Sequence, residues 1–457
     1  MPSDLSQELP YFPDSSRYFA LFAQWPWAVY LDSAHPYGGA GRCDILAADP
    51  FVTLVTRGNI TEIERRGERT ASSEDPFDLL RRELGPVVQA REGAPFSGGA
   101  LGYFGYDLAR RIERLPSLAR DEAGVPEMAV GLYDWAVVVD HHRQSSWLVG
   151  QGRDPATHRG WNHLLRLLRG APAPFEKGDF KLSGAVESNL DPAAYTAAFR
   201  RVQHYIHEGD CYQVNLAQRF AVAAQGDPWF FYLLLRRANP APFSAFLRLP
   251  WLTVLSSSPE RFLRVSGRQV ETRPIKGTRP RGKTPQEDRE QIRMLQSSEK
   301  DRAENLMIVD LLRNDLGRSC SPGSVQVKRM FQVESFARVH HLVSTITGSL
   351  APGHDALSLL RACFPGGSIT GAPKIRAMQI IEELEPCRRG VYCGAIGYIG
   401  CDGDMDTNIA IRTLVHRDGV LRFWAGGGVV ADSAVDAEYQ ETLDKAAAVL
   451  DLLERLR

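Results

Sequence analysis

A single lysine, Lys276, stands in a short stretch rich in arginine, Thr272–Pro280 (TRPIKGTRP). An amine held in an electropositive and partly apolar pocket loses its proton more readily and can act as a nucleophile. Most lysines are surface charges, so the same stretch is also typical of a solvated basic hairpin. The choice between these two interpretations depends on which acids and glycine-rich turns lie elsewhere in the chain.

Two carboxylates share a face of the helix that the pattern predicts over residues 299–314. Asp301 and Glu304 are three residues apart, and residues at that spacing lie side by side on a helix. A carboxylate near a helix N-terminus also favours the helix dipole, an interpretation that suits Asp301 better than Glu304. Apolar side chains later in the helix predict that it is largely buried and that it carries Glu304 with it: Met307, Ile308, Leu311 and Leu312.

The last helix of the chain, predicted to begin after Ser433, has a similar arrangement. Glu438, Glu441 and Lys445 recur at intervals of three and four residues and therefore line up along one side. Two helices that turn carboxylates inward can bind Mg²⁺, a hard ion that prefers oxygen ligands. Glutamates at this spacing are more often a solvated helix face, so the spacing alone leaves both interpretations open.

Several groups in the C-terminal half are suited to bind a small anion. Arg412 lies in an apolar, strand-like stretch (TNIAIRTLV), where an unpaired guanidinium is costly and is best matched by a carboxylate. The glycines Gly426–Gly428 leave backbone N–H groups open to an anion, and Ser368 and Thr370 in GGSITGAPK add hydroxyl donors. Each glycine-rich stretch can equally be a tight turn without a ligand.

The composition is that of a soluble globular protein, with 457 residues, a formal net charge of −1 and 44% hydrophobic residues. The 54 basic residues are dispersed, so nucleic-acid binding is not expected. The N-terminus is acidic and polar, unlike a signal peptide, and no stretch is long and apolar enough to predict a membrane helix. Seven cysteines without a CxxC pair suit reduced, buried positions, and we expect a cytoplasmic protein.

Short strands joined mainly by hairpins dominate the predicted elements, with strands expected at 19–27, 28–31 and 44–55. Because helices do not alternate one by one with strands, the pattern predicts an α+β protein of two lobes, with large stacked antiparallel β-sheets flanked by helices. Residues 1–150 are expected to form an N-terminal lobe and 190–457 the catalytic region, joined by a linker at 151–189. No glycine-rich loop of the dinucleotide-binding type opens a helix, so a nucleotide is not expected.

A series of segments in the C-terminal half resembles, in order, the chorismate-utilising enzymes. This family includes anthranilate, isochorismate, salicylate and aminodeoxychorismate synthases, and the N-terminal half resembles it through GGALGYFGYDLARR (98–111). The resemblance implies the fold of anthranilate synthase component I. The matching segments are SPERF (258–262), TRPIKGTRPRG (272–282), DRAENLMIVDLLRNDLGR (301–318), HHLVS (340–344), FPGGSITGAPKIRAM (364–378), YCGAIGY (392–398), MDTNIAIRTL (405–414), GGGVVADS (426–433) and AEYQETLDKA (437–446).

Lys276 is the residue that separates the members of this family. Anthranilate synthases resemble the stretch but carry alanine at this position, whereas PIKGT resembles the pattern of the aminodeoxychorismate synthases. The resemblance therefore implies that Lys276 attacks C2 of chorismate and expels the C4 hydroxyl, and that ammonia then adds at C4 and displaces the lysine. Glu260 is implied to be the acid that protonates the departing hydroxyl.

The resemblance also implies a metal site and a substrate pocket. Mg²⁺ on the ring carboxylate would be held by Glu304 and Glu441, with Glu438 close by. The substrate would be bound by further residues of the C-terminal half: His341, Thr370, Tyr392, Arg412, Gly426, Gly427, Gly428 and Lys445.

Partners follow from the resemblance as well. The sequence shows no glutaminase domain or lyase, so the family pattern implies ammonia from a glutamine amidotransferase subunit and 4-amino-4-deoxychorismate as the product, on the route to p-aminobenzoate and folate. Anthranilate or isochorismate chemistry, or a non-catalytic amino-acid-binding subunit, are the alternatives. Relatives bind tryptophan at positions that match Ser33, Arg42, Cys43, Pro242, Phe243 and Ser244, although the glycine-rich loop before Cys43, and Cys43 itself, depart from their pattern.

Overall fold

Antiparallel strands dominate the structure, a computed structural model that describes residues 5–38, 41–89, 93–170, 178–336 and 338–456. The described strands form two sheets of 12 strands each, here called sheet A and sheet B. Neighbouring strands in both sheets pair antiparallel. The predicted α+β class with large antiparallel sheets is therefore confirmed.

Sheet A contains strands from both ends of the chain. In spatial order its strands are β1 (Ser6–Leu9), β10 (Ser145–Gly150), β9 (Trp135–Asp140), β3 (Cys43–Ala47), β2 (Ala28–Asp32), β13 (Phe243–Leu249), β14 (Leu252–Ser258), β23 (Thr413–Arg417), β24 (Val420–Val429), β12 (Gln213–Gly226) and β11 (Phe180–Ser188), and β20 (Gly371–Ala372) pairs with β12.

Sheet B is assembled in the same mixed way. Its order is β17 (Ile275–Pro280), β19 (Val339–Ser349), β16 (Gln269–Arg273), β15 (Arg261–Ser266), β22 (Met405–Ile409), β21 (Ala395–Gly400), β7 (Gly99–Phe104), β8 (Met128–Tyr133), β4 (Val52–Arg57), β5 (Ile60–Arg65) and β6 (Glu68–Ser72), and β18 (Gln326–Ser335) pairs with β19.

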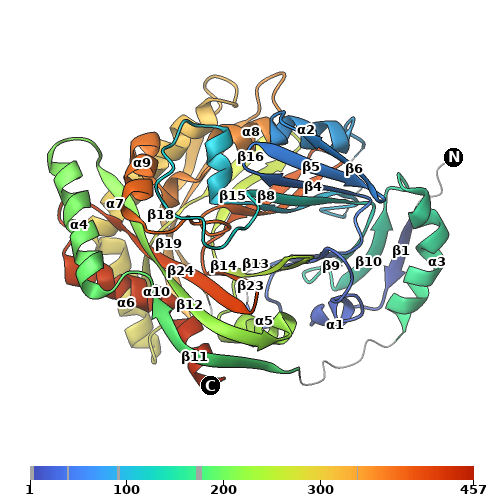
Figure 1. Cartoon of the computed structure of the whole chain (residues 1–457), viewed down its shortest axis with the longest axis horizontal. Coiled ribbons are helices and arrows are strands. Elements are labelled where there is room, and N and C mark those ends of the chain that lie inside the picture. Colours follow the sequence, from blue (N-terminus) through green and yellow to red (C-terminus); the bar gives the residue numbers. More distant parts are fainter. Residues whose placement is uncertain (1–4, 39–40, 90–92, 171–177, 337, 457) are drawn as a thin grey trace.

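Helices cover the outer faces of the two stacked sheets, as Figure 1 shows for α2 and α8 above sheet B and for α1 and α5 below sheet A. The helices are α1 (Ser16–Phe19), α2 (Pro76–Leu84), α3 (Pro155–Arg169), α4 (Pro192–His207), α5 (Pro228–Ala238), α6 (Pro285–Ser297), α7 (Glu299–Gly317), α8 (Ala356–Cys363), α9 (Lys374–Leu384) and α10 (Val435–Arg455), with 3₁₀ turns η1 (Tyr106–Arg111) and η2 (Gly367–Ile369).

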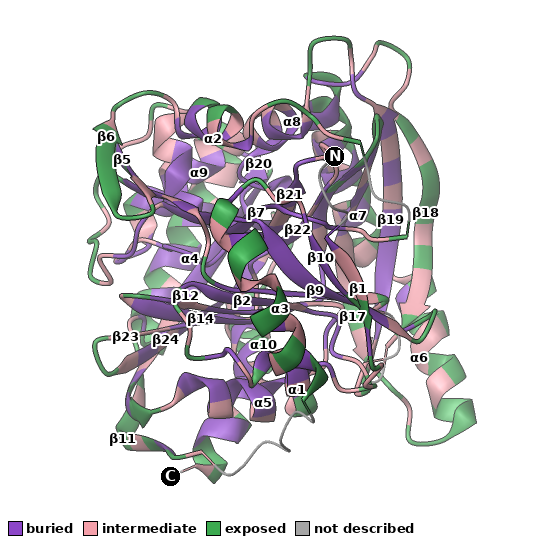
Figure 2. Cartoon of the chain, turned by 90° about the vertical axis from the view of Figure 1, so that its right-hand side faces the viewer, coloured by how far each residue is buried: buried purple, intermediate pink, exposed green. Residues whose placement is uncertain are grey.

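Separate apolar cores hold these layers together. One core lies between the sheets, where Val29 and Leu247 of sheet A meet Leu101 and Ile396 of sheet B. A second packs sheet B against α2, α7 and α8, and a third packs sheet A against α1, α5 and α10. Figure 2 shows the central strands as buried, whereas α6 and the outer strand β18 are largely exposed. Burial of apolar area on both faces of each sheet is the main stabilising contribution to this arrangement.

The prediction of a linker at 151–189 is corrected by the structure, because most of the described part of this range forms a helix and a strand. Asp154 caps α3 by accepting a hydrogen bond from the Ala156 backbone, and β11 extends sheet A by pairing with β12. The stretch rich in Pro, Gly and Ala at 171–176 lies outside the described residues. The apolar face of α3, with Leu164 and Leu168 buried, belongs to the core of sheet A.

The expected division at residue 150 does not separate two sheets. Strand β2 pairs with β13 in sheet A, and β7 pairs with β21 in sheet B, so each sheet combines strands from 1–150 and from 190–457. Pairing between segments distant in sequence depends on tertiary contacts that local patterns do not carry.

Two of the predicted strands also differ from the structure. Helix α1 ends at Phe19, and residues 20–27 form turns instead of the expected strand. Phe19 and Phe22 pack into the core under sheet A and do not pair with a neighbouring strand. The single strand expected at 44–55 is two strands, β3 in sheet A and β4 in sheet B, and the chain crosses between the sheets at Asp49, whose φ is 53°. Among the described residues, no helix is long and apolar enough to cross a membrane.

Candidate active site

A cavity of about 780 Å³ opens between α7, α10, the edge strand β17 and the glycine-rich end of β24. It brings together several of the groups that the sequence singled out as reactive, acidic or anion-binding. Those that line it are Glu260, Lys276, Asp301, Glu304, His341, Ser368, Tyr392, Arg412, Gly426, Gly428, Glu441 and Lys445. Thr370, Gly427 and Glu438 do not line the cavity.

Lys276 enters the cavity from an irregularity in strand β17. Ile275 pairs with Val343 and Thr278 with His341, so three steps along β17 correspond to two steps along β19. This extra residue is a β-bulge, and such bulges bend a strand and redirect its side chains. The bulge therefore explains how a lysine on an otherwise basic edge strand comes to line an interior cavity.

Gly277 permits the bulge through both its backbone and its missing side chain. Its φ of +76° lies in the left-handed region, and a Cβ at this position would lie 2.8 Å from Asp301 Cγ and 2.9 Å from Leu295 Cδ1. Any larger residue would push β17 away from α6 and α7. Lys276 thus depends on its neighbour for its position.

The Lys276 amine is set up to lose its proton. Its side chain is half-buried and lines the cavity. Burial lowers the pKa of Lys276, and the neighbouring Lys445 ammonium lowers it further, while Glu304 and Glu260 oppose the shift. Nζ donates a hydrogen bond to the Ser368 carbonyl at 3.3 Å. An amine with a lowered pKa is a better nucleophile near neutral pH.

Glu260 shows the opposite shift. The residue is 5% exposed, and burial raises its pKa to about 7, although the Ser368 hydroxyl, the Lys276 ammonium and the Ile275 backbone N–H all favour the ionised form. A carboxyl group with this pKa keeps its proton in a large part of the molecules at neutral pH. Glu260 can therefore donate a proton to a leaving group beside Lys276.

Arg412 offers an unpaired cation to a ligand. Its backbone has a φ of 49°, which is uncommon for a residue with a side chain, and burial lowers the pKa of its guanidinium. No acid among the described residues forms an ion pair with it. A half-buried guanidinium that no acid of the described chain neutralises is well suited to a ligand carboxylate.

His341 is held neutral in the same cavity. Burial lowers its pKa to about 3, with further contributions from the Arg412 and His340 charges, and its Nδ1 lies 2.9 Å from Thr278 Oγ1. A neutral imidazole can exchange hydrogen bonds with a bound ligand but adds no charge at neutral pH.

The three glutamates that the sequence proposed as metal ligands lie near one another but are engaged by lysines. Lys300 Nζ lies 3.9 Å from Glu304 Oε1 and 3.4 Å from Glu438 Oε1, and Lys445 Nζ lies 2.6 Å from Glu441 Oε1. Burial raises the pKa of Glu304. For Glu441 burial acts in the same direction, but the ammonium groups of Lys445, Lys300 and Lys276 together outweigh it and lower the pKa. Within the described part of the chain, no three acids, histidines or cysteines are arranged as a ligand cluster.

One carboxylate in this group, that of Glu438, nevertheless has an oxygen that can accept a further ligand. Glu438 is 1% exposed, and its Oε2 is buried without a hydrogen-bond partner among the described residues, while Oε1 accepts from Ser433. A Cβ on Gly427 would lie 3.0 Å from Glu438 Oε2 and 3.4 Å from Glu441 Oε1, so the glycine leaves room beside both carboxylates. An orphaned carboxylate oxygen and further carboxylates fit a hard cation such as Mg²⁺.

The remaining predicted substrate residues divide into two groups. Tyr392 stacks on Trp424 at a centroid distance of 5.9 Å, and Lys445 donates to the Gly426 carbonyl at 2.9 Å, so both shape the cavity wall. The Thr370 hydroxyl instead donates to the Gly366 carbonyl at 3.1 Å. Its role in this structure is to hold the turn before β20.

Sequence reasoning missed several residues of the cavity. Asn215 lines it from β12, and its Oδ1 has no hydrogen-bond partner in the part of the chain that the structure describes; Trp424 forms part of the wall. Arg389 lies behind it, fully buried, and donates to the carbonyls of Asn215 and Ile369. No spacing rule singles out an asparagine within a strand. An arginine and an acid four residues apart, such as Arg389 and Glu385, were a usable signal.

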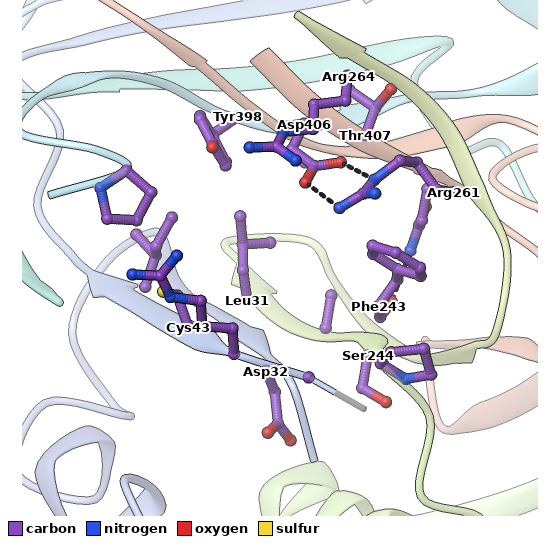
Figure 3. Close-up of a pocket in the computed structure, with 18 of the residues that line it drawn as sticks. Leu31, Asp32, Cys43, Phe243, Ser244, Arg261, Arg264, Tyr398, Asp406 and Thr407 are labelled. Atoms are coloured by element: carbon purple, nitrogen blue, oxygen red, sulfur yellow. Dashed lines mark hydrogen bonds and ion pairs between the residues drawn. The ribbon is translucent and has the colours of Figure 1, made fainter. Parts of the chain in front are cut away.

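A second cavity, of about 570 Å³, lies between the sheets and is shown in Figure 3. Arg42, Cys43, Pro242, Phe243 and Ser244 line it, as the sequence predicted for an amino-acid site. Ser33 is buried nearby with its hydroxyl unpartnered but does not line it, and Ala40 of the glycine-rich loop lies outside the described residues.

The wall of the second cavity is charged. Arg261 forms a paired interaction with Asp406 at 2.9 and 3.0 Å, and its guanidinium lies 5.0 Å from the centre of the Phe243 ring. Arg42 is held by Asp140, and burial raises the pKa of the Cys43 thiol to about 12. Cys43 is therefore an unreactive part of this wall.

Comparisons with known proteins agree with this geometry. The family described as chorismate binding enzyme matches residues 41–451. Aminodeoxychorismate synthase component 1 of Salmonella typhimurium is 51% identical over 98% of this chain and 97% of the relative, and that of Escherichia coli is 50% identical over 96% of each. The crystal structure of anthranilate synthase component I from Streptococcus pneumoniae superposes with a TM-score of 0.81 at 35% identity, covering 90% of this chain and 93% of that one.

Proposed function

The chain belongs to the family of chorismate binding enzymes, and from this premise we propose that it makes 4-amino-4-deoxychorismate from chorismate and ammonia. This is the activity for which its relatives in Salmonella and Escherichia are named. The observation that carries the proposal is the juxtaposition of Lys276, an amine of lowered pKa, and Glu260, an acid of raised pKa, in one cavity. Such opposed shifts are typical of a nucleophile and its acid partner.

The proposed reaction has two displacement steps. In the first, the Lys276 amine forms a bond to C2 of chorismate, the two ring double bonds shift toward C4, and the C4 hydroxyl leaves as water with the proton of Glu260. In the second, ammonia forms a bond to C4, the double bonds return, and the bond from Lys276 to C2 breaks. The protons released by the two nitrogens restore Lys276 and Glu260, so chorismate and ammonia yield the aminated product and one water.

The cavity's cations are placed to orient an acid with two carboxylates. We assign the enolpyruvyl carboxylate to Arg412, which no acid of the described residues neutralises, and to the backbone N–H groups near Gly426 and Gly428. His341, neutral at physiological pH, and the stacked pair of Tyr392 and Trp424 complete the walls.

We further propose that Glu304, Glu438 and Glu441 hold a Mg²⁺ ion. The unpartnered Glu438 oxygen and the open space at Gly427 support this set. When bound, Mg²⁺ would neutralise the ring carboxylate of the substrate and withdraw electrons from the diene. Lys300, which now contacts both Glu304 and Glu438, would have to give up these contacts.

Ammonia is proposed to come from a glutamine amidotransferase subunit. The two relatives are called component 1, a name that implies a second component for them. Burial raises the pKa of all seven cysteine thiols in this chain, so none has the lowered pKa of a nucleophilic thiolate. All seven are free, which suits the reducing cytoplasm in which we place the enzyme.

The second cavity is proposed to bind a free amino acid, with L-tryptophan as the first candidate. Its mixed charges, with Arg261 and Asp406 on one wall and Arg42 and Asp140 on another, suit a zwitterion, and Phe243 supplies an aromatic surface. Calorimetric titration with tryptophan and with alanine tests this assignment, and equal or absent binding of both would contradict it.

The experiment that tests the proposed reaction is product analysis. The purified chain is mixed with chorismate, Mg²⁺ and ammonium, and the product is identified by mass. We expect the aminated product without release of pyruvate, and no product when glutamine replaces ammonium. Pyruvate release would indicate anthranilate-type chemistry instead, isochorismate would identify water as the nucleophile, and no turnover would indicate a binding subunit.

A further inference from the structure

One residue of the catalytic cavity, Ser368, contacts both proposed reacting groups. Its backbone carbonyl accepts the hydrogen bond from Lys276 Nζ at 3.3 Å, and its hydroxyl favours the ionised form of the Glu260 carboxyl, which lines the same cavity. Ser368 is 7% exposed and lines the cavity together with Lys276 and Glu260. A single side chain and its own carbonyl thus connect the nucleophile to the acid.

The backbone of Ser368 is fixed by groups that take no part in the reaction. Arg389, fully buried and paired with Glu385, donates to the carbonyl of Ile369 at 2.9 Å. A Cβ on Gly367 would lie 2.6 Å from Leu311 Cδ2, so the turn packs directly against α7. The turn therefore provides a rigid support for the groups that it holds.

We propose that Ser368 is a positioning residue that holds the Lys276 amine and the Glu260 carboxyl at a fixed separation. Its carbonyl orients the amine, and its hydroxyl orients the carboxyl. An amine that donates one N–H to this carbonyl keeps its lone pair free for attack on a ligand in the cavity. A carboxyl that interacts with the hydroxyl is kept from rotating away from the leaving group. This assignment rests on the proposed function and adds to it the group that aligns its two reacting residues.

Among the groups that stabilise the ionised form of Glu260, the Ser368 hydroxyl is a side-chain group that can be removed without changing a charge. The others are Lys276 on β17, Lys445 on α10 and the Ile275 backbone N–H, and the buried Cys393 thiol is a further titratable group that interacts with Glu260. The hydroxyl favours the ionised carboxylate, so its removal raises the pKa of Glu260. A purely structural role for Ser368 would leave this titration where it is.

The test is an infrared titration of the Glu260 carboxyl in the intact chain without chorismate. The band of the protonated acid is assigned as the one missing from Glu260→Gln. We expect Ser368→Ala to move its midpoint upward by about one pH unit, the contribution of a hydrogen bond to a charged group. Ser319→Ala serves as the matched control, because Ser319 is a buried serine that does not line the cavity, and we expect no shift.

A second variant separates the hydroxyl from the packing. Ser368→Thr retains a hydroxyl and is expected to keep the wild-type midpoint, whereas a shift equal to that of Ser368→Ala would overturn the proposal. An unmoved midpoint in Ser368→Ala would overturn it as well. Failure of the proposed function is seen separately. If the Glu260 midpoint shifts as expected in Ser368→Ala but the wild-type chain yields no aminated product, the proposed reaction is refuted and the positioning role of Ser368 remains.

Discussion

Glu260 and Arg261 are consecutive in the chain but line different cavities. Glu260 lies in the catalytic cavity beside Lys276, whereas Arg261 lies in the second cavity and pairs with Asp406. The segment from Pro259 to Arg261, at the junction with β15, therefore forms a wall shared by the two cavities. Pro259 and Ile275 line both. The position of Glu260, the proposed acid, therefore depends on the packing of both cavities.

The raised pKa of Glu260 predicts how activity depends on pH. A proton donor with a pKa of about 7 loses activity as the pH rises through that value. We expect the rate of Glu260→Gln to lack this decline and to be lower by about 10²-fold or more. Rates are compared as ratios to wild type at each pH, so that the protonation of ammonia cancels. A constant ratio would contradict the assignment.

The same group predicts a pH dependence of stability. The native carboxyl keeps its proton up to about pH 7, whereas the unfolded one loses it near 4.5, so the native state binds more protons between these values. The free energy of unfolding should therefore fall across this window, by about 3 kcal/mol in total from Glu260 alone. Denaturant unfolding of Glu260→Gln at several pH values checks this, and we expect a flatter profile than for wild type.

Arg412 should determine affinity for the substrate. Arg412→Lys keeps the charge but loses the planar pair of donors, and we expect kcat/KM for chorismate to fall by about 10- to 100-fold, mainly through KM. Arg422→Lys, in the partly buried part of β24 outside the cavity, is the control and should change little. Equal KM values for the Arg412 variant and wild type would remove Arg412 from the carboxylate site.

Glu441 should determine the response to Mg²⁺. We expect Glu441→Gln to raise the half-saturating Mg²⁺ concentration by about tenfold or more, measured as activity against added metal. Asp444→Asn is the matched control, because Asp444 is an acid of the same helix that lines the same cavity but is not in the proposed ligand set. A shift of equal size in the control would attribute the effect to overall charge.

Gly277 should be required for the position of Lys276. Gly277→Ala introduces a Cβ 2.8 Å from Asp301 Cγ at a φ of +76°, whereas Gly267→Ala has a φ of +59° with open space around it. Both variants should lose about 1 kcal/mol of stability from the backbone. We expect a loss of turnover from Gly277→Ala alone, and equal activities of the two variants would contradict the steric argument.

Much of the site could be predicted from the sequence because its residues lie in elements with strong local signals. Helix α7 begins at Glu299, as predicted, with Ser298 as its capping residue, and the spacing of Glu438 and Glu441 places both on one helix. The resemblance to the family supplied Lys276 and Glu260. Both are found in one cavity, as that resemblance implied.

The rest depends on contacts between distant segments. The bulge at Lys276 exists only in the pairing of β17 with β19, and the described part of 151–189 is stabilised by sheet A, so neither has a local signature. Thr370 was assigned to the substrate, but its hydroxyl is used by the Gly366 carbonyl. Hydrogen bonds of this kind depend on backbone geometry that spacing alone does not give.

The covalent role of Lys276 is tested most directly by mass spectrometry of the intact protein. The chain is mixed with chorismate and Mg²⁺ without ammonia, and the modified residue is located by peptide mapping, with Lys276→Ala as the control. The account predicts an added mass of chorismate less one water on Lys276, lost when ammonia is supplied and absent from the variant. Aminated product formed by Lys276→Ala at the wild-type rate, or an unmodified Lys276 in a chain that turns over, would contradict it.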